Sequence, residues 1–138
     1  MFEKNTQHYF IICGRAEGGI EQSDIIVDLR PESSTYLEHV AVELTEDNHR
    51  ALYVPERFAH GYQVLCDKTE TSYQVGEFYM PGSEGGLHYN DPRLQLRWPL
   101  PVTVISEKDQ VWPMLSAQES DLKQLMNLEA VVAGGRTL

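Results

Sequence analysis

The sequence predicts an all-β domain, an antiparallel sandwich or barrel, with a helical tail. Three observations predict it. Short segments alternate apolar and polar residues, turn residues separate them at spacings of about 8–12 residues, and only one stretch has helical periodicity. Such alternation is typical of strands that have one face on a core and one facing outward. With 138 residues, 41% of them hydrophobic, the chain fits one domain with one core, 1–138.

Seven segments have this strand composition. They are 9–13, 24–29, 39–44, 51–54, 62–66, 71–75 and 102–105. Pro55 and Pro81 follow strands, where a missing backbone N–H costs no ladder bond. The glycine- and proline-rich stretch 81–101 is irregular, and a connection of that length predicts either a functional loop or a cover over the barrel mouth.

The helical stretch follows the last predicted strand. Ser116 and Glu119 have the spacing of a capping box, in which a serine and a glutamate three residues later satisfy free backbone donors. Apolar residues recur at helical spacing after it, and Gly134-Gly135 is a typical helix end. We therefore expect barrel and loops over about 9–115, followed in the chain by a helix over about 116–133 that serves as a packing or dimer element.

Charge and composition exclude several partners. A formal net charge of −10 argues against nonspecific binding to nucleic acid or to an anionic membrane. No apolar run approaches the roughly 20 residues that span a bilayer, and the first residues do not resemble a signal peptide, so we expect a cytoplasmic protein. A phosphate-bearing small molecule stays possible, because a few local arginines suffice to bind it. Cys13 and Cys66 lack CxxC spacing and are interpreted as reduced, buried thiols.

Histidine spacing gives no metal motif. The five histidines, at positions 8, 39, 49, 60 and 88, form neither an H-x-H pair nor a helical HxxxH. We therefore expect no metal site and no cofactor.

One segment resembles a family motif. Residues 53–62, Tyr-Val-Pro-Glu-Arg-Phe-Ala-His-Gly-Tyr, are similar to the V-P-x-G-F-A-H-G-F motif of the dTDP-4-dehydrorhamnose 3,5-epimerases. Further segments resemble other motifs of that family in the same order. They are 24–30, Tyr73 with Tyr79, 85–92, 96–99 and 105–109. The resemblance extends over about residues 9–115 and implies a cupin-like jelly roll, also called a double-stranded β-helix.

The resemblance also implies a chemistry. The family exchanges protons at C3 and C5 of a nucleotide-linked 4-keto-6-deoxy sugar, in deoxysugar and cell-surface polysaccharide biosynthesis. The reaction needs a base, a donor to the enolate oxygen and an acid on the opposite face. By resemblance, Tyr73 matches the acid and Asp109 matches the aspartate that holds the base, while His60 lies near the sugar and is paired with Asp24. The family is dimeric, which implies a homodimer.

Each of these residues also has an ordinary interpretation. His60 can be a core histidine satisfied by Asp24, which would fix its tautomer, and Tyr73 can be a strand aromatic. Arg30 at a strand end can bind a phosphate or form a surface salt bridge. For substrate binding we consider the residues Tyr79, Arg30, His88 and Arg97, with Arg97 as a candidate diphosphate contact.

The sequence departs from the family pattern at the base. The family's histidine lies in an R-G-L-H strand that should precede Tyr9, and its lysine falls near Tyr9 itself, but the sequence begins at Met1. Residues 86–89, Gly-Leu-His-Tyr, spell part of that motif within the later loop. Two hypotheses follow: an epimerase in which His60, His88 or a partner subunit replaces the base, or a non-catalytic sugar-nucleotide-binding or structural relative.

Overall fold

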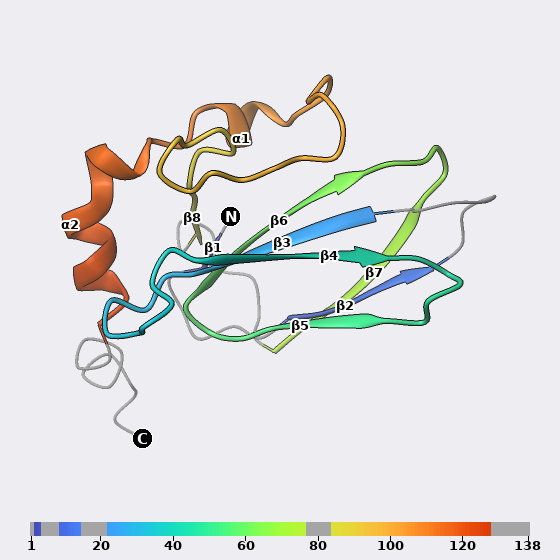
Figure 1. Ribbon diagram of the computed structural model, residues 1–138, viewed down its shortest axis with the longest axis horizontal. Helices are drawn as coiled ribbons and strands as arrows, with labels where there is room; N and C mark the ends of the chain where they lie inside the picture. Colours follow the sequence, from blue (N-terminus) through green and yellow to red (C-terminus); the bar gives the residue numbers. More distant parts are fainter. Residues whose placement is uncertain (1, 4–8, 15–21, 77–83, 128–138) are drawn as a thin grey trace.

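The computed structural model of the chain describes residues 2–3, 9–14, 22–76 and 84–127, with the side chains of 22–76 and 84–127. This part of the chain is mostly strands with a helix toward its C-terminal end (Figure 1). Within it, neither helix is long and apolar enough to cross a membrane.

Two three-stranded antiparallel sheets carry the fold. In one, β3 (Gln22–Asp28) lies between β4 (His39–Leu44) and β6 (Phe58–Val64). In the other, β2 (Tyr9–Gly14) lies between β5 (Ala51–Val54) and β7 (Glu70–Val75). A two-residue pair joins β1 (Phe2–Glu3) to β8 (Glu84–Gly85). The predicted strands over 9–75 are thus confirmed, with ends shifted by a few residues.

The two sheets face each other across an apolar core. Leu44 of β4 and Leu52 and Val54 of β5 are buried together, with Ile26 and Phe58 packed against them. Because side chains alternate along a strand, Ile26 shares its face of β3 with Asp24 and Asp28. These carboxylates therefore start from the inner face of the sandwich.

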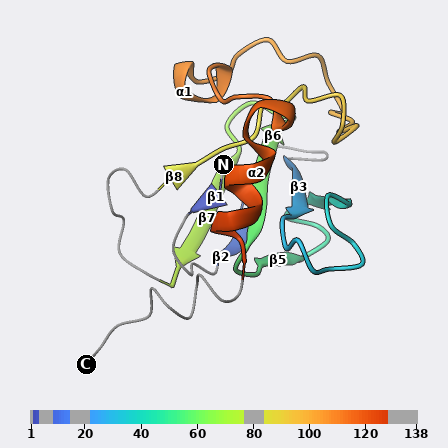
Figure 2. The same cartoon turned by 90° about the vertical axis from the view of Figure 1, so that its left-hand side faces the viewer.

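The opposite face of β3 packs on the C-terminal part of the chain. Ile25 and Val27 are buried in one cluster with Leu115 and Leu122 of α2 (Leu115–Leu125), which lies at one end of the sandwich. Figure 2 views the molecule from that end, with α2 in front. A one-turn helix, α1 (Glu107–Gln110), precedes it.

The predicted strand 102–105 is wrong. This segment follows Pro99 and Pro101 and has no regular secondary structure, and Val104 is 92% exposed. Proline cannot donate to a ladder, and strand-like composition alone does not pair a segment with a sheet. The segment instead forms one wall of a groove described below.

The capping box predicted at Ser116 is also wrong. The helix begins one residue earlier, with Met114 at the N-cap position and no side-chain bond from it. The Asp91 carboxylate, from the preceding loop, accepts the Leu115 backbone N–H at 2.5 Å instead. The helix ends at Leu125, where the Arg57 guanidinium donates to the Met126 carbonyl. The part of the predicted helix beyond residue 127, with Gly134-Gly135, lies outside the described residues.

Candidate functional site

A histidine–aspartate pair lies on the inner face of the first sheet. In the register of β3 and β6, Asp24 is opposite Tyr62 and Ile26 is opposite His60, so Asp24 and His60 are diagonal neighbours. His60 Nε2 lies 2.7 Å from Asp24 Oδ1. The Asp24 side chain is fully buried and that of His60 is 18% exposed. The sequence-based pairing of these two residues is confirmed.

This contact defines how the imidazole can handle a proton. With the Nε2 proton donated to Asp24, the neutral ring carries its lone pair on Nδ1. If Nδ1 then takes a proton, the buried carboxylate balances the new positive charge. Tyr62 stacks beside His60, with ring centroids 6.0 Å apart and planes at 20°. The pair can therefore hold or move a proton at a defined atom.

The second oxygen of Asp24 is held as well. Gln22 Nε2 donates to Asp24 Oδ2 at 2.8 Å, and Thr71 Oγ1 donates to Gln22 Oε1 at 2.5 Å. Gln22 is fully buried. Since Thr71 belongs to β7 of the second sheet, three hydrogen bonds join the two sheets and end at His60. We call this chain of Thr71, Gln22, Asp24 and His60 the relay.

The relay also shows where Tyr73 points. Thr71 reaches the first sheet, and Tyr73, two residues later in β7, shares its face. Tyr73 therefore faces the same inter-sheet side as His60. It is nevertheless 67% exposed and Tyr62 is 54% exposed, whereas Leu52 and Val54 on β5 are buried. The sandwich is packed on its β4–β5 side and accessible on its β6–β7 side.

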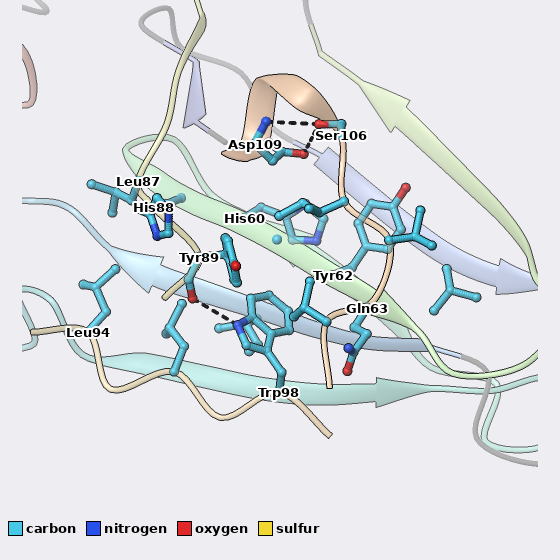
Figure 3. Close-up of a pocket in the computed structure, with 18 of the residues that line it drawn as sticks. His60, Tyr62, Gln63, Leu87, His88, Tyr89, Leu94, Trp98, Ser106 and Asp109 are labelled. Carbon is cyan, nitrogen blue, oxygen red and sulfur yellow. Dashed lines mark hydrogen bonds between the residues drawn. The ribbon is translucent and has the colours of Figure 1, made fainter. Parts of the chain in front are cut away.

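A groove of about 730 Å³ runs along β6 and the segment 84–109. Its walls include His60, Tyr62, His88, Tyr89, Trp98 and Asp109, which Figure 3 labels. The Trp98 indole donates to the Tyr89 carbonyl at 3.0 Å, which fixes the ring in the wall. Aromatic walls with a few polar groups are typical of small-molecule sites.

His88 and Asp109 line this groove but are held by local partners. His88 Nδ1 accepts the backbone N–H of Asn90 at 3.2 Å, and its ring stacks on Tyr89. The Asp109 carboxylate accepts from Ser106 Oγ at 2.7 Å and from the Trp112 indole at 3.2 Å. The structure brings His60, His88 and Asp109 to one groove, and Asp24 is the carboxylate that contacts His60.

Arg30 forms an ion pair at the far end of β3. Its guanidinium donates to both oxygens of Asp28, at 2.8 and 2.7 Å, and lies over the Phe58 ring. Burial raises the pKa of Asp28, but the bonds from Arg30, Ser33 and Thr35 outweigh it and hold that pKa well below its ordinary value. The salt bridge expected for Arg30 is thus observed.

The other two predicted substrate contacts have different outcomes. Arg97 is exposed and is not among the groove residues. Tyr79 lies outside the described residues. In the described ranges, no three His, Cys, Asp or Glu side chains are arranged to hold a metal ion.

Sequence reasoning missed Gln22 and Thr71. Each stands two residues before a predicted site residue, Asp24 and Tyr73 respectively, in the same strand. The two-residue period of strands places such neighbours on the same face. Reading polar side chains at that spacing would have found both.

Two facing sheets, with a part-buried histidine–aspartate pair and an aromatic groove beside it, define a mostly-β protein with a candidate small-molecule site. Residues 3–117 match the family model described as dTDP-4-dehydrorhamnose 3,5-epimerase. The chain therefore belongs to the dTDP-4-dehydrorhamnose 3,5-epimerase family.

Proteins similar to this chain in sequence carry the name of the family. The dTDP-4-dehydrorhamnose 3,5-epimerase of Salmonella typhimurium is 38% identical over 113 residues, 81% of this chain and 60% of the relative. That of Methanothermobacter thermautotrophicus is 40% identical over 95 residues, 67% of this chain and 51% of the relative. The chain thus spans about half to three fifths of the length of these relatives.

Solved structures agree in fold. The dTDP-6-deoxy-D-glucose-3,5-epimerase of Legionella pneumophila, in complex with dTDP-4-keto-L-rhamnose, superposes with a TM-score of 0.77 at 32% identity, over 88% of this chain and 63% of that one. The dTDP-4-dehydrorhamnose 3,5-epimerase of Bacillus anthracis, with TDP and PPi bound, gives a TM-score of 0.74 at 36% identity, over 83% and 64%.

Proposed function

We propose that this protein is a sugar-nucleotide 3,5-epimerase that exchanges protons next to the ketone of a nucleotide-linked 4-keto-6-deoxy sugar. The observation that carries the proposal is the contact of His60 with the buried Asp24 carboxylate beside the groove, in a chain of this family. The enzyme names of the relatives favour this function over a binding-only or structural protein.

The chemistry requires only proton transfer. A base removes the hydrogen at C3 or C5, and the electron pair of that C–H bond delocalises onto the C4 oxygen. An acid then returns a proton to the opposite face of the same carbon, which inverts it. No electron leaves the substrate, so the step needs no redox partner.

We assign the base to His60. Asp24 can balance the charge that the ring gains, at 2.7 Å. His88 is a weaker candidate because the contacts described for it are the Asn90 N–H and the Tyr89 ring, neither of which can balance a charge on the imidazole. Tyr73 is the proposed acid, since it faces the same inter-sheet side from the other sheet. Asp109, which lines the groove, is proposed as a further catalytic residue beside the sugar.

The remaining assignments concern binding and assembly. Tyr79, Arg30, His88 and Arg97 are proposed as contacts to the nucleotide sugar, and the jelly roll as the complete topology. We also propose a homodimer. Light scattering after size-exclusion chromatography that shows only a 15.7 kDa monomer would overturn the dimer.

Solvent exchange tests the activity directly. The protein is incubated with the dTDP-linked 4-keto-6-deoxy sugar in deuterated water, and NMR follows deuterium at C3 and C5. We expect incorporation at both positions, and we expect His60→Gln to abolish it. Binding of the sugar nucleotide without any incorporation would contradict the epimerase assignment and support the binding-only alternative.

A further inference from the structure

We propose that Gln22 and Thr71 are positioning residues, which hold the Asp24 carboxylate in the orientation that keeps the His60 proton on Nε2. This proposal rests on the proposed function, and it adds two residues that lie outside the groove. The relay that joins them to His60 carries the argument.

The relay fixes the direction of each hydrogen bond. The Asp24 carboxylate accepts from both sides, from His60 Nε2 on one oxygen and from Gln22 Nε2 on the other. Gln22 must then present its carbonyl oxygen to the opposite side, where only a donor fits. Thr71 Oγ1 supplies that donor at 2.5 Å. The carboxylate, which only accepts, therefore sets the amide orientation, and the Thr71 hydroxyl, which donates to the amide oxygen, holds the amide in place.

Burial makes these orientations costly to change. Asp24 and Gln22 are both fully buried, so neither can exchange its partner for water without opening the sandwich. A carboxylate held at only one oxygen can rotate about its Cβ–Cγ bond. The bond from Gln22 restrains that rotation and keeps Oδ1 directed at the His60 ring.

The relay also links the two strands that carry the proposed acid and base. Thr71 and Tyr73 lie on one face of β7, and His60 lies on β6 of the facing sheet. On this side the sheets share little packing, as the exposure of Tyr62 and Tyr73 shows. The Thr71–Gln22 bond therefore helps to set how far Tyr73 stands from His60.

The test compares Gln22→Met, Thr71→Val and Thr71→Ser in the full chain. Methionine keeps the length of glutamine without its amide, valine keeps the shape of threonine without its hydroxyl, and serine keeps the hydroxyl. The first readout is the ¹⁵N NMR signature of the His60 ring without substrate, which reports the tautomer. The second is deuterium exchange into the keto sugar, resolved into kcat and KM.

We expect Gln22→Met to move the His60 ring toward the Nδ1–H tautomer and to lower kcat about 10-fold, with KM within about twofold of wild type. Thr71→Val should change both readouts in the same direction by a smaller factor, and Thr71→Ser should restore them. A role in stability alone would leave the tautomer unchanged in the folded variants.

Wild-type ¹⁵N signals in folded Thr71→Val and Gln22→Met would overturn the proposal. If Gln22→Met does not fold, the ¹⁵N signals of the His60 ring in Thr71→Val and Thr71→Ser decide the proposal. The ring signature needs no substrate. A wild-type protein without exchange activity would therefore contradict the proposed function, while the NMR comparison still decides the positioning roles.

Discussion

Asp24 Oδ1 and His60 Nε2 lie 2.7 Å apart although the two residues are diagonal, not opposite, in the register of β3 and β6. His60 reaches the groove and is 18% exposed, while the Asp24 carboxylate behind it is fully buried. The ring thus has a wet side, which faces the groove, and a dry side, which faces the charge partner.

Asp24→Asn tests the charge of this pair. Asparagine can still accept the His60 proton through its carbonyl oxygen, but it does not balance a protonated ring. We expect exchange into the keto sugar to fall about 100-fold, because the charge that the ring gains during proton transfer then has no carboxylate partner. The rate of deuterium incorporation measures it. Asp47→Asn removes an exposed carboxylate from a turn and is the matched control, with an unchanged rate.

Tyr73→Phe tests the proposed acid. The change removes only a hydroxyl from a side chain that is 67% exposed, so the free energy of unfolding should stay within about 0.5 kcal/mol of wild type. Proton return should slow by a factor on the order of 100. Tyr53→Phe, at a β5 position that alternates with the inward-facing Leu52 and Val54, is the control. Equal exchange rates in both variants would remove Tyr73 from the mechanism.

Strand alternation explains how much of this arrangement the sequence could predict. The strands that hold Asp24 and Tyr73 follow from local patterns, whereas the predicted strand 62–66 begins after His60, which lies in β6. The Asp24–His60 pair was implied by the family resemblance. Register, by contrast, is set by packing. The sequence therefore predicted that these residues share a site without predicting that Thr71 and Gln22 connect the sheets.

Local patterns failed where tertiary contacts decide. Ser116 has the spacing of a capping residue, but the Asp91 carboxylate reaches the helix start first. Residues 102–105 have strand composition, yet two prolines precede the segment and it joins neither sheet. Both failures occur in the C-terminal part of the chain, after β8. There, long-range contacts outweigh local propensity.

Asp28 predicts how stability depends on pH. Its pKa is lower in the folded chain than in the unfolded chain, so it contributes stability above the unfolded value of about 3.9. That contribution is lost as the pH falls through the folded value. We therefore expect the free energy of unfolding to decline below about pH 4. In Asp28→Asn this decline should be shallower, with lower stability at pH 7.

Urea unfolding at several pH values measures this effect. Arg30→Met removes the main donor to Asp28 and should reproduce part of the change, since both oxygens of Asp28 accept from that guanidinium. Parallel stability curves for wild type and Asp28→Asn between pH 5 and about pH 2 would contradict the assigned role.

Gly86 and Gly61 differ in how closely a tryptophan ring approaches them. A Cβ added at Gly86 would lie 2.2 Å from Trp112 Cδ2, whereas one at Gly61 would lie 3.4 Å from a Trp98 ring atom. Gly86→Ala must displace the Trp112 ring, whose indole also donates to Asp109. We expect it to lower the free energy of unfolding by about 1–3 kcal/mol, and Gly61→Ala to be tolerated. Thermal unfolding measures both, and Trp112→Leu should partly relieve Gly86→Ala, because the smaller side chain vacates the space that the new methyl group needs.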